Sequence, residues 1–197
     1  IFEDLGDLIS RCSSEEVPRD ESGNPTGIVR EEILWKHVHP MIKLKDSRVR
    51  KKALSKALEK FARQGITGIV SMEYAQDLRE VWSQLETPYP VEVAFVLLDR
   101  EPPPKIEEIK ELEDFYGFNI IGLKTFIDGT LGSRTARMSC PYEDSEGCGL
   151  FVEHALEGKL SSWLAETKRL KKRPVLHAIG DDAFSKSLEC VDPNHPI

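Results

Sequence analysis

The sequence has few of the features expected of a membrane, nucleic-acid-binding or disulfide-rich protein. Its 197 residues contain no apolar stretch near the roughly 20 residues of a membrane span, and no signal-peptide pattern opens the chain. The formal net charge of -7 argues against nucleic acid as a partner. The four cysteines, Cys12, Cys140, Cys148 and Cys190, are widely spaced and lack a zinc-ribbon pattern. We therefore predict a cytoplasmic protein with reduced thiols.

Amide side chains are also scarce, with three asparagines and three glutamines beside many lysines and glutamates. Few amides and many charges are a tendency of hyperthermophile proteins, so the composition hints at a thermophilic source. The 40% hydrophobic and 31% charged content is typical of a soluble globular protein. The length is sufficient for one domain with a sizeable core.

The most informative stretch is Phe118 to Asp144. It opens with an apolar run, residues 120–123, which is too short for a helix of normal length and predicts a buried strand. Lys124 follows at the expected strand end, before a loop rich in turn residues. A second apolar run, residues 174–176, leads to His177 in the same way. In parallel α/β folds the chemistry gathers where strands end, so these two strand ends are the best functional signal.

Strand and helix patterns alternate along most of the chain. Strands are predicted at 66–72, 91–98, 120–124 and 174–177, and helices at 46–65, 75–85, 105–116, 157–171 and 183–191. Four strand–helix repeats without hairpin signals between them predict a parallel sheet with right-handed crossovers.

A different pattern precedes residue 46. There we expect a short amphipathic helix at 1–12, a hairpin over 17–29, and a helix at 31–38 that ends before Pro40. The predicted domain boundary therefore separates this N-terminal region, residues 1–45, from the alternating region, residues 46–197.

Three blocks of sequence resemble the YtcJ-like branch of the metal-dependent amidohydrolases, amidohydrolase family 3. They are Arg19–Glu31 (RDESGNPTGIVRE), Gly122–Ala136 (GLKTFIDGTLGSRTA) followed by Pro141-Tyr142, and His177–Asp181 (HAIGD). The last block would be weak alone, but the three stand in the family's order and together span most of the chain.

The resemblance implies a fold for the family and indicates that this chain is only part of that fold. Family members are TIM (β/α)8 barrels, and the four predicted strands would be the second to fifth strands of that barrel. A complete barrel typically needs about 250 residues. We therefore expect an α/β fold that is a partial barrel, an internal piece of the family's catalytic domain.

The resemblance also implies a divalent-metal site, with zinc as the expected metal. In the family, an H-x-H on the first strand, a residue at the end of the fourth, and histidines from the fifth and sixth strands hold one or two ions. His177 matches the fifth-strand ligand. Lys124 matches the fourth-strand position, where many members carry a lysine carbamylated by carbon dioxide, an anionic oxygen donor that a hard or borderline cation accepts. The general base, an Asp on the eighth strand, would lie outside this chain.

Both candidate ligand positions also have simpler interpretations. His177 could be a core histidine bonded to the backbone, and Lys124 could pair with a carboxylate such as Asp128. Asp128 and Asp181 lie just beyond the two ligand positions and could orient a ligand through a hydrogen bond; Asp181 could instead cap the next helix. Arg134 could bind an anionic group of the substrate or form a structural ion pair.

Two further positions depart from the family pattern. Asp182 stands where the family usually has a basic or other residue type, which leaves a substrate contact there open. The pair His37 and His39 imitates an H-x-H, but it lies in a helical context downstream of the position of the family's motif. On a helix, residues i and i+2 point about 200° apart and could not share a metal, so we reject this pair as a metal site.

The leading functional hypothesis is a metal-dependent hydrolase of carbon–nitrogen, amide-like bonds in a small molecule. The chain alone would be inactive because it lacks the first-strand ligands and the base. An alternative keeps the barrel but uses Lys124 as a Schiff-base lysine of a lyase or aldolase. A third hypothesis is an inactive truncated domain that self-associates through its open sheet edges.

Overall fold

The computed structural model describes residues 6–42, 46–100 and 104–191. The chain divides into two compact units. One unit consists mainly of residues 44–125 and 162–175, and the other of residues 1–43, 126–161 and 176–196. We call them the sheet unit and the loop unit. No helix in the described ranges is long and apolar enough to cross a membrane.

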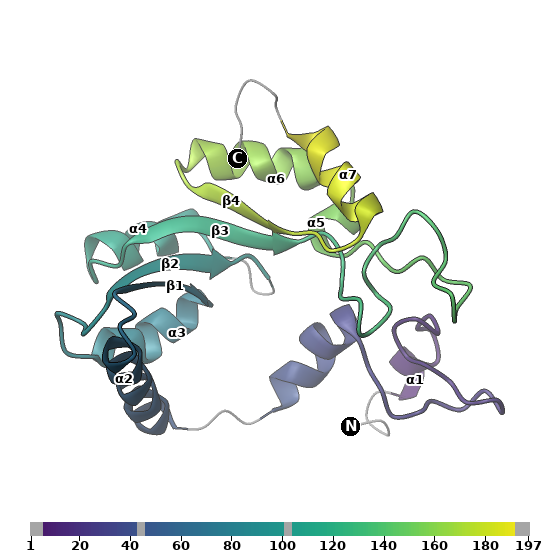
Figure 1. Ribbon diagram of the computed structural model, residues 1–197, viewed down its shortest axis with the longest axis horizontal. Helices are drawn as coiled ribbons and strands as arrows, with labels where there is room; N and C mark the ends of the chain where they lie inside the picture. The colour runs from purple at the N-terminus through teal and green to yellow at the C-terminus, as the bar shows by residue number, and fades with distance from the viewer. Residues whose placement is uncertain (1–5, 43–45, 101–103, 192–197) are drawn as a thin grey trace. The chain divides into compact units, whose positions relative to one another are not determined.

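A four-stranded sheet with the order β1-β2-β3-β4 is the main regular structure (Figure 1). The strands are β1 (Gly68–Glu73), β2 (Glu92–Leu98), β3 (Ile120–Phe126) and β4 (Arg173–His177). The pairs β1–β2 and β2–β3 are parallel. All four predicted strands are confirmed, with small shifts at their ends. Because β3 continues to Phe126, Lys124 lies inside this strand, and its predicted place at the strand end was wrong.

One helix precedes β1 and helical segments follow every strand, as predicted. They are α2 (Ser47–Arg63), α3 (Ala75–Glu80), the 3-10 turn η3 (Trp82–Gln84), α4 (Ile106–Asp114), α5 (Glu153–Leu156), α6 (Leu160–Arg169) and α7 (Asp181–Cys190). Asp46 caps α2 as expected, since its side chain accepts a hydrogen bond from the backbone N–H of Arg48. The helix predicted at 157–171 begins only at Leu160, and the short α5 that precedes it was not predicted.

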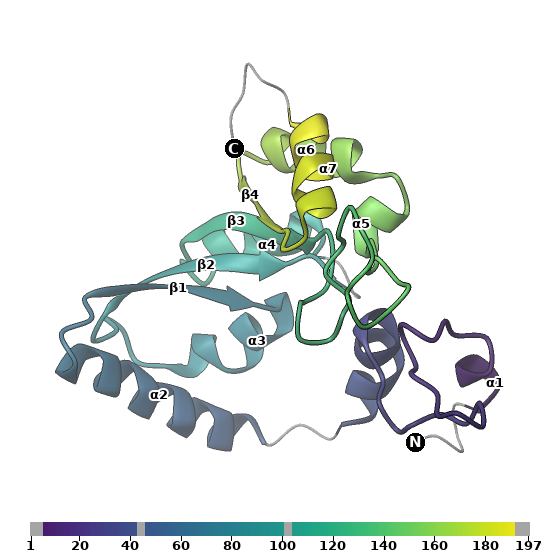
Figure 2. The ribbon, with the colours of Figure 1, turned by 45° about the vertical axis from the view of Figure 1, so that its right-hand side comes forward.

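Apolar and ionic contacts together hold the sheet unit. The rings of Trp82 and Phe95 pack edge to face at 4.8 Å between centroids, and Phe95 packs in the same way on Phe118 at 5.3 Å. Figures 1 and 2 place α2 and α3 next to each other beside β1. Arg50 of α2 pairs there with Asp77 of α3 at 2.6 Å.

The loop unit begins with short, irregular helices. The described part of the helix predicted at 1–12 is the single turn α1 (Gly6–Ile9), and residues 1–5 of that prediction lie outside the described residues. The predicted hairpin is reduced to one antiparallel bridge between Arg19 and Pro25. Ile9, Val17 and Ile33 form a small core beneath them.

The helix predicted at 31–38 is a π-helix, η1 (Ile33–Val38), followed directly by a 3-10 helix, η2 (His39–Met41). The prediction that helical structure ends before Pro40 was wrong. Pro40 occupies the first turn of η2, where a proline needs no backbone N–H and its fixed φ suits the helix.

We expect Glu73→Gln to change how stability depends on pH. Burial raises the pKa of the Glu73 carboxyl, although hydrogen bonds from Ser71 and Trp82 oppose this shift. A raised folded-state pKa means that the stability supplied by the neutral form is present at low pH and is lost as the pH rises through that pKa. In thermal melts, the melting temperature of the glutamine variant should therefore rise relative to that of the wild type as the pH increases from about 4 to 7.

The matched control is Glu86→Gln, which removes the same charge at an exposed position in the same unit. Its melting temperature relative to the wild type should change little over that pH range. Parallel behaviour of the two variants would contradict the assignment of the effect to burial of Glu73.

Candidate active-site loops

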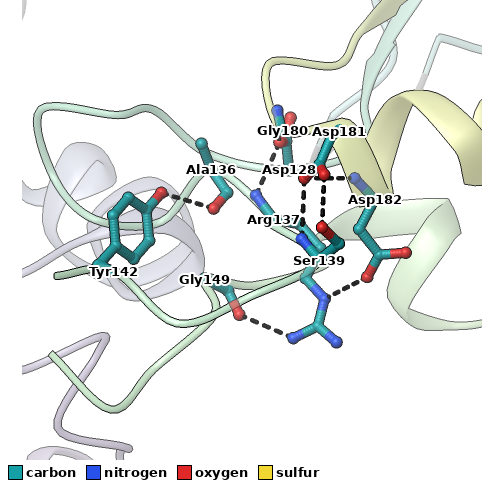
Figure 3. A network of polar contacts seen from close by, with 9 residues as sticks. All are labelled: Asp128, Ala136, Arg137, Ser139, Tyr142, Gly149, Gly180, Asp181 and Asp182. Atoms are coloured by element: carbon teal, nitrogen blue, oxygen red, sulfur yellow. Dashed lines mark hydrogen bonds and ion pairs between the residues drawn. The ribbon is translucent and has the colours of Figure 1, made fainter.

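Two loops of the loop unit follow β3 and β4, and four of the five predicted site residues, Asp128, Arg134, His177 and Asp181, lie in these loops or directly beside them. The first, residues 127–152, lies between β3 and α5, and the second, residues 178–180, lies between β4 and α7. Figure 3 shows one network that joins polar groups of the loop after β3 to the backbone of Gly180 and to Asp181 and Asp182 at the start of α7.

Asp128 is the centre of this network, with 1% of its surface exposed. Its Oδ2 accepts hydrogen bonds from the backbone N–H groups of Arg137, at 2.8 Å, and Gly180, at 2.7 Å. Its Oδ1 accepts a third from Ile179 at 3.0 Å. Bonds from N–H groups to a carboxylate are among the stronger hydrogen bonds in proteins. Asp128 therefore ties the loop after β4 to the loop after β3 (Figure 3).

Gly180 is required by the closeness of the two loops. A Cβ atom at this position would lie 1.8 Å from the carbonyl oxygen of Arg137 and 2.3 Å from its carbonyl carbon. The backbone of Gly180 has an ordinary φ of -73°, so the glycine is needed for space and not for an unusual conformation. No side chain larger than hydrogen fits unless the loops separate.

The side chain of Arg137 also links the loop after β3 to α7. Its Nε donates to Oδ2 of Asp182 at 2.8 Å, and its Nη1 donates to the carbonyl oxygen of Gly149 at 3.3 Å. Its guanidinium also lies over the ring of Phe151, 5.1 Å from the centroid. The side chain of Asp182 thus bonds within the protein.

Asp181 is the first residue of α7, whereas the N-cap position belongs to Gly180. Its Oδ2 accepts from the hydroxyl of Ser139 at 2.5 Å, and its Oδ1 accepts from the backbone N–H groups of Ser139 and Asp182. The hydrogen bonds from Ser139 lower the pKa of the Asp181 carboxyl. A carboxylate in the first turn also suits the positive end of the helix dipole.

His177 ends β4 and bonds to the loop after β3. Its Nε2 lies 3.0 Å from the carbonyl oxygen of Gly129. Because a carbonyl oxygen only accepts, Nε2 carries the proton in this bond, and in the neutral ring Nδ1 is then the nitrogen with a lone pair. The ring packs against Phe126 at 5.1 Å between centroids. A backbone bond of this kind is also what holds the ring of a metal-binding histidine.

Arg134 forms an exposed ion pair. Its Nε and Nη2 donate to the two carboxylate oxygens of Asp144 at 2.9 and 2.6 Å, and these bonds lower the pKa of Asp144. Arg134 also lies over the ring of Tyr142, 5.5 Å from its centroid. In this arrangement the guanidinium bonds to a carboxylate of its own loop.

Lys124 belongs to the sheet unit, and its side chain is buried. Within residues 6–42, 46–100 and 104–191, no group of three or more His, Cys, Asp or Glu side chains is arranged to hold a metal ion. The imidazole of His177 is a donor of the kind that divalent metals accept. Cys12, Cys140, Cys148 and Cys190 are free thiols.

Several residues of the network were not predicted. Arg137, Ser139 and Tyr142 lie within or next to the second sequence block, and the hydroxyl of Tyr142 donates to the carbonyl oxygen of Ala136 at 2.6 Å. Their position in a long loop rich in polar residues was the available signal. Their partners are mostly backbone atoms, which a sequence pattern does not reveal.

Comparison with known proteins agrees with the resemblance seen in the sequence. A family model described as "Amidohydrolase family" matches residues 9–194. The protein "Putative amidohydrolase YtcJ" of Bacillus subtilis is 26% identical over 190 residues, which are 91% of this chain and 35% of that protein. The chain thus belongs to the amidohydrolase family and spans about a third of this relative's length.

Two solved structures have a similar fold. One is described as an uncharacterized metal-dependent hydrolase from Pyrococcus furiosus, with a TM-score of 0.61 and 26% identity over 95% of this chain and 39% of that chain. The other carries the same description and comes from Pyrococcus horikoshii OT3, with a TM-score of 0.61 and 24% identity over 95% of this chain and 38% of that chain. The second, below 25% identity, bears on the fold alone.

Proposed function

We propose that the chain is part of the catalytic barrel of a metal-dependent hydrolase that acts on a carbon–nitrogen, amide-like bond of a small molecule. Membership of the amidohydrolase family supports the reaction class. The description of the Pyrococcus furiosus structure as a metal-dependent hydrolase supports the need for a metal. The observation that carries the proposal is His177, a strand-end histidine whose Nε2–H is bonded to the backbone and whose Nδ1 has a lone pair.

The barrel itself is part of the proposal. The strand order β1-β2-β3-β4 follows the sequence, with parallel pairing of β1 to β2 and of β2 to β3. Such an arrangement suits four consecutive strands of a (βα)8 barrel. In the proposed barrel these would be the second to fifth strands, and the remaining strands would belong to the part of the relatives that this chain does not span.

In this proposal, His177 and a carbamylated Lys124 would each supply a ligand to a divalent metal, with zinc as the expected ion. The metal, when bound, would polarise the scissile carbonyl and activate water. The residues of the loop unit have a different task. Asp128 would hold the segment after His177 in place through the N–H groups of Ile179 and Gly180.

Zinc titration of the 197-residue chain tests this assignment. We expect His177→Ala to weaken zinc binding by at least about 10-fold, since loss of even an outer partner of a metal ligand costs about that much. The measurement is calorimetric titration together with the intact mass and metal content of the purified chain. A mass increase of one carbon dioxide that disappears in Lys124→Ala would identify the carbamate.

The matched control is His37→Ala, which removes an exposed imidazole from η1. Zinc binding should be unchanged in this variant. If His37→Ala weakens zinc binding and His177→Ala does not, the proposed ligand is wrong and the rejected pair of histidines in η1 and η2 becomes the better candidate.

A further inference from the structure

Glu31 has an unusual backbone conformation next to the site. Its φ of +48° lies in the left-handed region, which a residue with a side chain adopts only at an energetic cost. It is the first residue of the helical segment that contains η1. Because glycine would avoid the cost, the presence of glutamate indicates that its side chain is needed. The contacts of its carboxylate show which part of the structure the side chain holds.

The carboxylate of Glu31 accepts a short hydrogen bond from Thr135. The distance from Thr135 Oγ1 to Glu31 Oε1 is 2.6 Å, and Thr135 has no exposed surface. The same Oγ1 lies 3.0 Å from the backbone N–H of Thr130, from which it accepts. Ser133 Oγ is 3.1 Å away and can donate its own proton. A hydroxyl has one proton, and the carboxylate at 2.6 Å is a much closer acceptor for it than the carbonyl oxygen of Thr130 at 3.5 Å.

The peptide group between Gly129 and Thr130 links this hydroxyl to His177. A trans peptide is planar, with its N–H and C=O pointing in opposite directions. Its N–H donates to Thr135 Oγ1, and its carbonyl oxygen accepts from His177 Nε2 at 3.0 Å. Holding the N–H on one side therefore fixes the direction of the carbonyl that meets the imidazole on the other.

Close packing leaves no room for another arrangement at this peptide. A Cβ atom on Gly129 would lie 2.0 Å from Thr135 Oγ1 and 2.3 Å from Glu31 Oε1. The hydroxyl and the carboxylate thus lie directly against the backbone of Gly129. The backbone N–H of Gly129 also donates to the carbonyl oxygen of Thr135 at 3.1 Å, which joins the two ends of the turn.

We propose that Glu31 is a positioning residue for His177, acting through the hydroxyl of Thr135 and the peptide group of Gly129 and Thr130. Three hydrogen bonds run in one direction, from imidazole N–H to peptide, from peptide N–H to hydroxyl, and from hydroxyl to carboxylate. Such chains polarise one another, so the negative charge of Glu31 favours the proton on Nε2 and leaves Nδ1 as the ligand nitrogen. The metal-binding part of this inference rests on the proposed function.

The tautomer of His177 is the direct test. Under mildly alkaline conditions imidazoles are neutral, and ring 15N shifts in the metal-free chain report which nitrogen carries the proton. The wild type should show His177 protonated on Nε2. Thr135→Val, which removes the hydroxyl at nearly constant volume, and Glu31→Ala should both raise the share of the Nδ1-protonated form by at least about twofold. Thr135→Ser keeps the hydroxyl and should behave as the wild type.

Two controls separate positioning from general damage. Thr26→Val removes a hydroxyl that bonds to the carbonyl oxygen of Pro18 in the same unit, and it should leave the His177 shifts unchanged. Glu31→Gln keeps an acceptor but removes the charge, so its effect should lie between the wild type and Glu31→Ala. Wild-type His177 shifts in folded Thr135→Val and Glu31→Ala would overturn the proposal.

The same variants distinguish this inference from the proposed function. We expect Thr135→Val to weaken zinc binding by about 10-fold, the lower end of the effect of removing an outer partner of a ligand. If the tautomer changes in the variants but His177→Ala leaves zinc binding intact, the positioning role stands and the metal-ligand role fails. If zinc binding depends on His177 but the tautomer never changes, the reverse holds.

Discussion

Gly180→Ala is expected to lower the free energy of unfolding by about 3 kcal/mol or more, the upper part of the range for overpacking a tightly packed site. The new methyl group would lie 1.8 Å from the carbonyl oxygen of Arg137 and 2.7 Å from its backbone nitrogen. Both are backbone atoms, which cannot rotate away as a side chain can. Relief of the clash must therefore move one loop and lengthen the hydrogen bonds to Asp128. Urea unfolding followed by circular dichroism measures the loss.

Gly132→Ala is the matched control for this prediction. It lies in the loop after β3, and a Cβ atom there would meet no heavy atom within 4 Å. Its stability should equal or slightly exceed that of the wild type, because alanine restricts the unfolded chain more than glycine does. A loss of stability in Gly180→Ala no larger than that in Gly132→Ala would contradict the prediction, because it would show that the close approach of Gly180 to Arg137 does not limit stability.

Asp128→Ala should be at least as destabilising, by about 3 kcal/mol or more. The substitution leaves three backbone N–H groups of Arg137, Ile179 and Gly180 without their acceptor, and a buried unsatisfied donor costs about 1 to 3 kcal/mol. Asp144→Ala is the control, since it removes a carboxylate of the same loop that forms an exposed pair with Arg134. Urea unfolding should show a much smaller change for the control.

Asp128→Asn refines the same experiment. The asparagine has nearly the same volume as the aspartate but replaces one acceptor oxygen by an NH₂ group, which cannot accept from a backbone N–H. Its stability should fall between the wild type and Asp128→Ala. An asparagine variant as stable as the wild type would contradict the conclusion that all three hydrogen bonds to the carboxylate contribute.

The strands could be predicted from sequence because their signal is local. A short apolar run bounded by turn residues, such as residues 120–123, identifies a buried strand without knowledge of its neighbours. The error at Lys124 has the same origin, since the pattern ends a strand at the first charged residue after an apolar run. In the structure the strand continues to Phe126 with Lys124 buried inside it. The π-helix η1 was also beyond prediction, because its departure from the α-helix has no pattern in residue type.

The sequence identifies candidate residues one by one, but it does not reveal the network that joins them. The sequence points to His177 because it directly follows an apolar run, and to Asp128 and Asp181 because each lies just beyond the candidate ligand of its strand. Their partners are mainly backbone N–H and C=O groups, which every residue has and which therefore carry no sequence signal. The bond between Glu31 and Thr135 joins residues 104 positions apart. The sequence placed both residues in family blocks, but only the structure shows that they meet.

The three hydrogen bonds of Asp128 have a consequence for building chimeras between relatives. The loop after β4 is held by Asp128, an acceptor that belongs to the loop after β3. Gly180 of the loop after β4 also packs directly against the backbone of Arg137. A graft that transplants one loop alone would bring donors without their acceptor, or an acceptor without its donors. A chimera should therefore exchange two segments together, residues 128–137 and residues 177–182, although 39 residues separate them in the sequence.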